Sequence, residues 1–342
     1  MFATRSKMFV IRSGFLLIAE ALITTAFSQS RPKSAPIIPN FVLDKIEVVG
    51  EPLEESGFYG APLCDPDGNL YLRTDEHLAV DENPVWKISP KGKKLQVYSA
   101  PKETEKEFRL GDFNVGADGS FYAVTYDYNE KTEKYILLRY GSDGEVSSKS
   151  RLQLPELFLL DKIGIFASGS ILVSGHYSDK ASESVRGHSR LLVLTSDGAP
   201  AGEVHLSIKA TGSAGDFPPP GSVSMGEDGN AYLLRGEEVL VLSPSAQLQR
   251  SVAVSSPAEG FEPERIQVSH GVLSVTFYKV ARGKTGNIEV MFRTFDTSTG
   301  VVQAEYVPKP GFNYQLCFSP DAGYTFLSRE HDKTVLKRAW VR

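Results

Sequence analysis

Charged, amide and imidazole side chains stand where apolar, alternating segments of this chain begin, and in the polar stretches that join such segments. If carboxylate and amide oxygens converge, they can hold Ca²⁺, and a carboxylate can also act as a general base. The same residue types are common at the polar starts of buried strands, where they only hold water. The candidate ligand-binding residues are Arg109, Asp112, Asp161, His176, His188, Asp216, Glu264 and Asn313.

Four of the six histidines fall in the polar stretches, namely His77, His176, His188 and His331. Such a set could form a metal site or a pH-sensitive site. Because no His-x-x-x-His or other metal-ligand spacing accompanies them, we expect no metal centre and no cofactor, and keep a divalent metal as the alternative. The chain also has no Gly-x-Ser-x-Gly elbow, Walker loop or zinc-protease helix, so we assign no catalytic residue.

Short strands must position these residues, because beyond residue 28 the chain shows apolar alternation rather than amphipathic helices. A tight turn followed by an apolar strand recurs, as in "CDPDGNLYLR" (64–73), "GADGSFYAV" (116–124) and "GEDGNAYLL" (226–234). Asp-Gly between two such runs is the strongest short-range hairpin signal. Turns of this first series lie at Asp67-Gly68, Asp118-Gly119, Ser168-Gly169, Asp228-Gly229, His270-Gly271 and Asp321-Ala322-Gly323.

A second series of turns alternates with the first, at 89–93, 141–145, 195–199, 243–247 and 297–301. Each period of about fifty residues therefore holds four strands, which is the signature of a β-propeller. Six periods can be counted, and the last is one strand short, but "FVLDKIEVV" (41–49) can supply it. The sequence predicts an all-β, single-domain, six-bladed β-propeller over 41–342, closed by an N-terminal strand that completes the last blade.

The stretches "DPDGNLYL" and "GEDGNAYLL", with the later "SDG" turns, resemble NHL-repeat and related six-bladed propellers over nearly all of 41–342. The enzymes of similar architecture are the gluconolactonase-like (SMP-30) propellers, which use a divalent metal near the central channel. Where that resemblance implies a metal-binding Glu in the first blade, this chain has Gly60. Its Asn313 stands one residue too early, which turns a strand side chain to the opposite face. We therefore carry over no metal ligand.

Cys64 and Cys317 are the two cysteines, and they stand in the first and last blades, which are neighbours in a closed ring. In an oxidising compartment they could form a disulfide. Two buried free thiols are the alternative, because cysteine often serves as a small apolar residue.

Residues 1–28 have the features of a secretory signal peptide. Arg5, Lys7 and Arg12 precede an apolar stretch over 14–27, and small residues precede a cleavage point after Ser28. Because the stretch is shorter than a membrane span and contains Glu20, an uncleaved anchor is only the alternative. We expect an exported protein, periplasmic or secreted, with a short linker over 29–40.

The charge pattern argues against nucleic acid or stable membrane insertion. The net charge is −5 and there is no long basic run. Long polar loops at 74–84, 126–134, 175–190 and 278–287 would gather on one face of a propeller, where binding residues usually lie. We therefore expect a monomeric binding module whose ligand is an unknown protein, glycan or small molecule. The alternative is a metal-dependent hydrolase or lactonase with its metal at the central channel.

Overall fold

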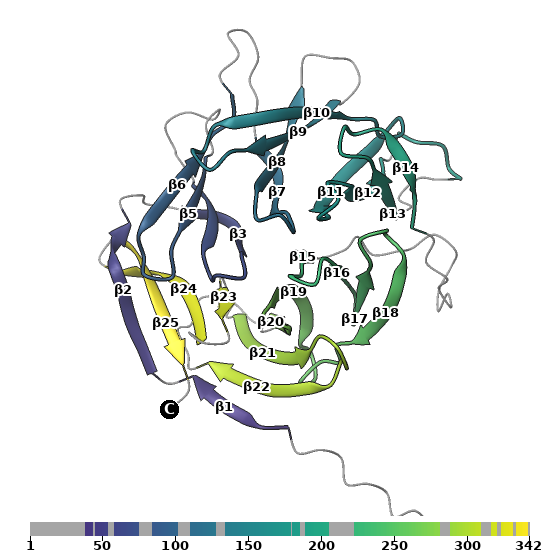
Figure 1. Ribbon diagram of the computed structural model, residues 1–342. Helices are drawn as coiled ribbons and strands as arrows, with labels where there is room; N and C mark the ends of the chain where they lie inside the picture. Colours follow the sequence, from purple (N-terminus) through teal and green to yellow (C-terminus); the bar gives the residue numbers. More distant parts are fainter. Residues whose placement is uncertain are drawn as a thin grey trace, which may run out of the picture. The chain divides into compact units, whose positions relative to one another are not determined.

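The computed structural model describes residues 38–340 except 44, 54–57, 75–83, 102–109, 128–133, 179, 185–188, 205–221, 281–287, 309–315, 320–322 and 331–332. Every regular element in these ranges is a β-strand. No helix in this part of the chain is long and apolar enough to cross a membrane. The strands form six sheets arranged in a ring, which is the predicted six-bladed β-propeller (Figure 1).

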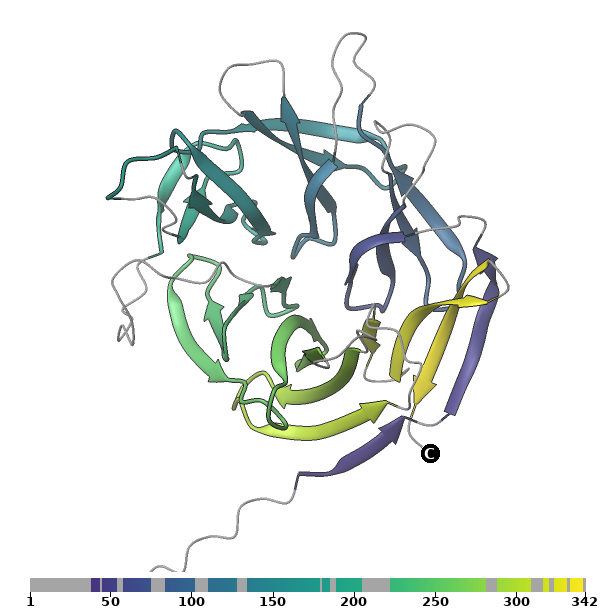
Figure 2. The same ribbon diagram turned by 180° about the vertical axis from the view of Figure 1, so that it is seen from behind.

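Each blade has four antiparallel strands ordered from the middle of the ring to its rim, as both views show (Figures 1 and 2). Blade 1 contains β3 (Phe58–Cys64), β4 (Leu70–Thr74), β5 (Val85–Ile88) and β6 (Lys94–Tyr98). Blade 2 contains β7 (Leu110–Val115), β8 (Phe121–Asp127), β9 (Lys134–Tyr140) and β10 (Val146–Leu152). Blade 3 contains β11 (Phe158–Ile165), β12 (Ile171–Tyr177), β13 (Ser189–Leu194) and β14 (Pro200–Glu203).

The second half of the ring repeats this order. Blade 4 contains β15 (Ser222–Met225), β16 (Ala231–Arg235), β17 (Glu238–Leu242) and β18 (Leu248–Ala253). Blade 5 contains β19 (Glu262–Ser269), β20 (Val272–Val280), β21 (Ile288–Asp296) and β22 (Val302–Pro308). Blade 6 contains β23 (Leu316–Ser319), β24 (Gly323–Glu330), β25 (Lys333–Trp340) and, from the start of the chain, β2 (Lys45–Leu53).

The N-terminal segment closes the ring, and it does so with two strands rather than the one expected. β2 pairs antiparallel with β25 and completes blade 6. Before it, β1 (Asn40–Leu43) pairs parallel with β22 and adds a fifth strand to blade 5. Leu43, at the end of β1, is 1% exposed and packs with Tyr278, Phe292 and Tyr324. The N-terminal segment therefore supplies the outermost strand of two neighbouring blades, β1 in blade 5 and β2 in blade 6.

The aspartates of the first turn series hold the hairpins together. Asp118 accepts hydrogen bonds from the Ser120 N–H (3.0 Å) and the Tyr122 hydroxyl (3.0 Å). Asp228 accepts the same pair of bonds from the Asn230 N–H (3.1 Å) and the Tyr232 hydroxyl (2.8 Å). One carboxylate thus fixes the turn and satisfies a tyrosine of the next strand, whose ring is buried. This explains the Asp-Gly-x-x-Tyr pattern that blades 2 and 4 share.

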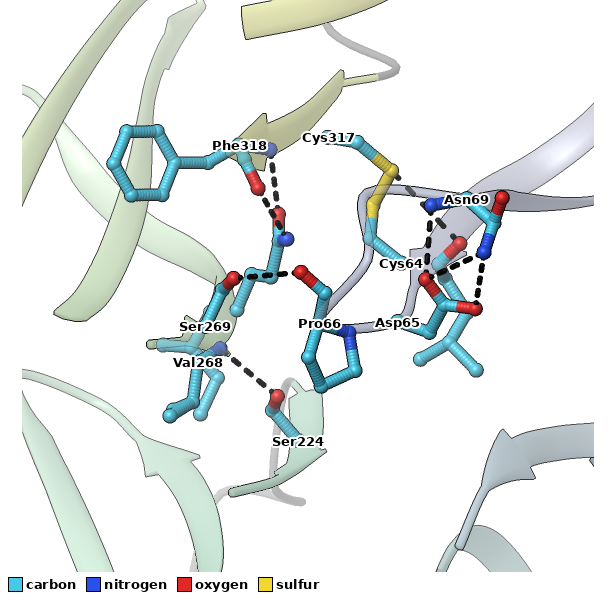
Figure 3. Close-up of a disulfide and its surroundings, with 12 residues drawn as sticks. Cys64, Asp65, Pro66, Asn69, Ser224, Val268, Ser269, Cys317 and Phe318 are labelled. Carbon is cyan, nitrogen blue, oxygen red and sulfur yellow. Dashed lines mark hydrogen bonds between the residues drawn. A yellow bond between two sulfur atoms is a disulfide. The ribbon is translucent and has the colours of Figure 1, made fainter. Parts of the chain in front are cut away.

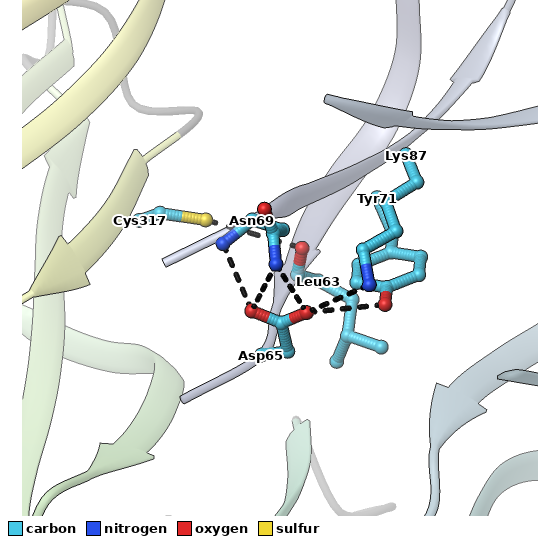
Figure 4. Close-up of polar contacts among 6 residues, drawn as sticks. All are labelled: Leu63, Asp65, Asn69, Tyr71, Lys87 and Cys317. Atoms are coloured by element: carbon cyan, nitrogen blue, oxygen red, sulfur yellow. Dashed lines mark hydrogen bonds and ion pairs between the residues drawn. The ribbon is translucent and has the colours of Figure 1, made fainter. Parts of the chain in front are cut away.

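In blade 1 the same role falls to a different aspartate. Asp65, not Asp67, accepts hydrogen bonds from the Asn69 N–H (2.9 Å) and the Tyr71 hydroxyl (3.1 Å), as Figure 4 shows. Lys87 lies 3.4 Å from the same carboxylate. Because Asp65 is buried, these partners offset the cost of removing its charge from water.

Glycines of the second turn series allow neighbouring blades to approach closely. Gly198, in the outer turn of blade 3, lies against the outer strand of blade 2, so a Cβ atom there would be 2.2 Å from the Arg151 carbonyl oxygen. The Gly198 carbonyl in turn accepts a hydrogen bond from the Gln153 N–H (2.9 Å). At the junction of blades 6 and 1, Gly92 meets the carbonyl of Val49 on β2 in the same manner. These turns therefore set the contact between blades.

The core lies between the blades. At the junction of blades 1 and 2, the rings of Tyr71, Tyr98, Phe121 and Tyr140 pack together, and the Tyr98 and Phe121 centroids are 4.1 Å apart. Burying one large apolar side chain stabilises a fold by about 1.5–3 kcal/mol. Similar apolar clusters lie between blades 2 and 3, between blades 3 and 4, and between blades 4 and 5.

Candidate functional site

Half of the candidate residues lie in the described part of the chain. Asp112 is on β7, Asp161 on β11, His176 on β12 and Glu264 on β19. The other four, Arg109, His188, Asp216 and Asn313, fall outside the described residues. His77 and His331 also fall outside them.

The three carboxylates share one local geometry. Each stands at a register shift in the innermost strand of its blade: Asp112 between Leu110 and Phe113, Asp161 between Leu160 and Lys162, and Glu264 between Pro263 and Arg265. A bulge of this kind releases a residue from cross-strand pairing and can redirect its side chain, and bulges are frequent next to active sites.

Asp112 joins blade 2 to blade 3. Its carboxylate accepts hydrogen bonds from Lys162 Nζ (2.9 Å) and from the Ile163 N–H (2.9 Å). Two residues further on, Asn114 donates from Nδ2 to the Ile163 carbonyl (2.7 Å). Both peptide groups of Ile163 are therefore held by blade 2 side chains, which fixes the second half of β11 against blade 2.

The Asp112 side chain is 15% exposed and its partner Lys162 is 37% exposed. Burial raises the pKa of the Asp112 carboxyl, and the charge and hydrogen bond of Lys162 and the Ile163 N–H oppose this rise. Arg73, whose guanidinium donates to the Gly111 carbonyl from blade 1, opposes it as well. The net effect is a pKa of Asp112 above the usual value of an aspartate, with burial as the largest cause.

Asp161 pairs with His176. Asp161 Oδ2 lies 2.9 Å from His176 Nδ1, and the two side chains are 25% and 35% exposed. His176 was expected in the loop over 175–190, but β12 extends to Tyr177, so the imidazole is carried by a strand. Pairing of His176 with Leu159 and Ser189 fixes its backbone on both sides.

Asp112, Asp161, Lys162 and His176 are polar residues of blades 2 and 3, and we call these four residues the bulge cluster. They form two ion pairs that the chain links, because Asp161 and Lys162 are consecutive, and Asp161 is bonded to His176 while Lys162 is bonded to Asp112. The cluster offers two carboxylates, one ammonium group and one imidazole. The exposed Glu264 does not join it, because it lies on blade 5, across the ring from blade 2 (Figure 1).

Sequence reasoning did not assign Lys162, Arg73 or Asn114 to the site. A usable signal existed for Asn114, because residues 112 and 114 share one face of a strand. Lys162 follows Asp161 directly, but its bond to the neighbouring blade depends on the bulge. Among the described residues no three His, Cys, Asp or Glu side chains gather as a metal site.

The structure joins Cys64 to Cys317 by a disulfide between the inner strands of blades 1 and 6, with Cα atoms 5.7 Å apart (Figure 3). Ser269 of blade 5 donates to the Pro66 carbonyl (3.2 Å) just beyond Cys64. Gln267 of blade 5 bonds both backbone groups of Phe318, next to Cys317 (2.6 Å each). Inner strands from three blades therefore meet around this disulfide.

No protein-family model and no curated protein sequence matches the chain. Solved structures of similar fold include a gluconolactonase from Xanthomonas campestris, at 13% identity and a TM-score of 0.47, over 84% of this chain and 88% of that one. An aldose sugar dehydrogenase from Streptomyces coelicolor is 13% identical with a TM-score of 0.42, over 86% and 99%. A luciferin-regenerating enzyme is 11% identical with a TM-score of 0.48, over 86% and 94%.

These similarities carry no argument about the activity of this chain. The strand topology itself defines the class of protein: the chain is a six-bladed β-propeller. Its chemistry must be argued from its own residues, because propellers host many unrelated functions.

Proposed function

We propose that the protein is an exported binding module whose ligand contacts the bulge cluster, on the face where the loops between second and third strands lie. The observation that carries this proposal is the bulged position of Asp112 and Asp161 on neighbouring inner strands, where Asp112 is bonded to Lys162 and Asp161 to His176. A bulge leaves one residue out of the strand pairing and can redirect its side chain, and bulges are frequent next to active sites. The bulged positions of Asp112 and Asp161 therefore favour a binding role over a purely structural one.

The chemistry of the cluster favours a polar ligand with both donors and acceptors. Carboxylates accept hydrogen bonds and the Lys162 ammonium group donates them, while the imidazole can do either. Lys162, Asp161 and His176 are each about one quarter to one third exposed, so a ligand can reach them without unfolding the blades. A small polar molecule, or a polar group of a glycan or protein, fits this description.

A thermal-shift screen of sugars, sugar acids, amino acids and nucleosides tests the proposal. We expect at least one compound to raise the melting temperature of the native protein, and the shift to disappear in Asp161→Asn and Lys162→Gln. The matched control is His270→Gln. His270 lies in a turn of blade 5, away from the cluster, and pairs with Glu227 in a turn of blade 4 (3.2 Å). A shift that survives both cluster substitutions contradicts the proposal.

Export rests on two independent observations. The first 28 residues have the composition of a signal peptide, and the Cys64–Cys317 disulfide is of a kind that persists in oxidising compartments. We expect the protein recovered from the periplasm or medium of an expressing bacterium to begin at Gln29, as a monomer. Recovery of the full-length chain in the membrane fraction instead would show an uncleaved anchor.

A further inference from the structure

The Asp161–His176 pair has the arrangement of a histidine general base that is oriented by a carboxylate. We infer that His176, oriented by Asp161, is a general base that can activate water for hydrolysis of an ester at the bulge cluster. This inference goes beyond binding and does not depend on which ligand the cluster holds.

The hydrogen bond defines which imidazole nitrogen is basic. Asp161 Oδ2 is 2.9 Å from Nδ1 of His176, so the neutral imidazole keeps its proton on Nδ1 and donates it to the carboxylate. Within the described part of the chain Nε2 makes no hydrogen bond, and its lone pair is directed away from Asp161. About one third of the His176 side chain is exposed, and we assign Nε2 as the nitrogen that meets water and a small substrate.

Both members of the pair are held in place by neighbours. Asp161 is followed by Lys162 and Ile163, which Asp112 and Asn114 bind from blade 2. His176 sits in a strand that is paired on both sides. Positioning of this kind lowers the entropic cost of bringing a base to its substrate.

The second histidine–carboxylate pair of the described chain lacks these features. His270 and Glu227 are 3.2 Å apart, and their side chains are 46% and 45% exposed at a turn. The His270–Glu227 pair therefore serves as the comparison for His176, because it shows a histidine–carboxylate pair on an exposed turn.

The proposed step consumes only water. As the water oxygen bonds to the acyl carbon of the ester, one of its protons passes to Nε2 of His176. The bond from the acyl carbon to the leaving oxygen then breaks, and the proton on Nε2 passes to that oxygen or to solvent. The products are a carboxylic acid and an alcohol or phenol, and Asp161 stabilises the imidazolium formed in between.

Hydrolysis of p-nitrophenyl acetate by the purified protein tests this inference. We expect His176→Gln to lower the rate by about 100-fold, the usual contribution of a general base, and Asp161→Asn to lower it by at least about tenfold. His270→Gln should leave the rate unchanged. Equal rates for the native protein and His176→Gln, or equal losses in His176→Gln and His270→Gln, overturn the proposal.

A second measurement does not depend on activity or on the ligand. Long-range ¹H–¹⁵N spectra of the native protein should show His176 as the Nδ1-protonated tautomer, and Asp161→Asn should redistribute the proton between the two nitrogens. A native imidazole protonated on Nε2 overturns the assignment, even if the cluster binds a ligand. Loss of ligand binding with the expected tautomer retained would instead count against the binding proposal alone.

Discussion

Cys64 and Cys317 are 253 residues apart in sequence, yet their Cα atoms lie 5.7 Å apart and a disulfide joins them. The ring is therefore closed twice at the junction of blades 1 and 6. The disulfide closes it near the middle, and the pairing of β2 with β25 closes it at the rim. The disulfide and the β2–β25 pairing are formed by different residues, so the two closures share no contact.

Removing the disulfide should destabilise the propeller without opening it. We expect the double substitution Cys64→Ser/Cys317→Ser to lower the free energy of unfolding by about 2–5 kcal/mol, because the bridge restricts the unfolded chain over a long loop. Urea denaturation with and without reductant measures the difference. Two free thiols in denatured, unreduced native protein would show that the bridge does not form.

Gly198→Ala should destabilise the protein far more than Gly119→Ala. Both glycines have positive φ, +87° and +75°, so alanine is strained at either site. At Gly119 an added Cβ would meet nothing within 4 Å, whereas at Gly198 it would lie 2.2 Å from the Arg151 carbonyl oxygen. We expect losses of about 1 kcal/mol at Gly119 and about 3 kcal/mol or more at Gly198. Equal losses in thermal denaturation would show that blades do not meet at this turn.

The Tyr232 hydroxyl should titrate at unusually high pH. Burial, followed by the hydrogen bond to Asp228 and its negative charge, raises the pKa of Tyr232 to about 12. Because the folded state holds the phenol proton more tightly than the unfolded state, this contribution to stability is complete below about pH 10 and is lost between pH 10 and 12. Asp228→Asn should lower the Tyr232 pKa and shift this loss to lower pH, as ultraviolet titration would record. An unchanged titration curve would contradict the role given to the turn aspartate.

Metal content can be measured directly. We expect native mass spectrometry of the purified protein to show no stoichiometric divalent ion, and Ca²⁺, Mg²⁺ or Zn²⁺ to leave the melting temperature unchanged. This follows from the departures at Gly60 and Asn313 from the ligand pattern of metal-dependent propellers. One bound ion per chain, lost on chelation together with ester hydrolysis, would favour the metal-dependent hydrolase instead.

The number of blades could be predicted because the first turn of every blade has a glycine with positive φ, a local requirement that the sequence displays: Gly68, Gly119, Gly169, Gly229, Gly271 and Gly323. In blades 2 and 4 the turn aspartate also bonds a tyrosine of the next strand. Local rules were less complete in blade 1, where Asp65 rather than the turn residue Asp67 accepts the hydrogen bond of the Tyr71 hydroxyl. They also missed the division of the N-terminal segment into β1 and β2, because parallel pairing with β22 is a contact over 265 residues and leaves no local pattern.

The candidate site was predictable only in part. Asp112 and Asp161 could be identified because they begin inner strands, but their partners depend on bulges, and one extra residue in a strand changes which side chain faces the next blade. Lys162 and Arg73 could therefore not be assigned from the sequence. Glu264, like Asp112, is a carboxylate at a bulge in an inner strand. Only the order of the blades in the ring shows that the two residues lie far apart, on blades 5 and 2.

The crossing of β1 and β2 between blades 5 and 6 dictates an order of assembly. Both strands are synthesised well before their partners, because β22 and β25 belong to the last two blades of the ring. Until blades 5 and 6 have been made, Leu43 lacks its core neighbours, and β1 and β2 lack the strands with which they pair. Any truncation before β25 would therefore leave β2 without a partner and blade 6 incomplete.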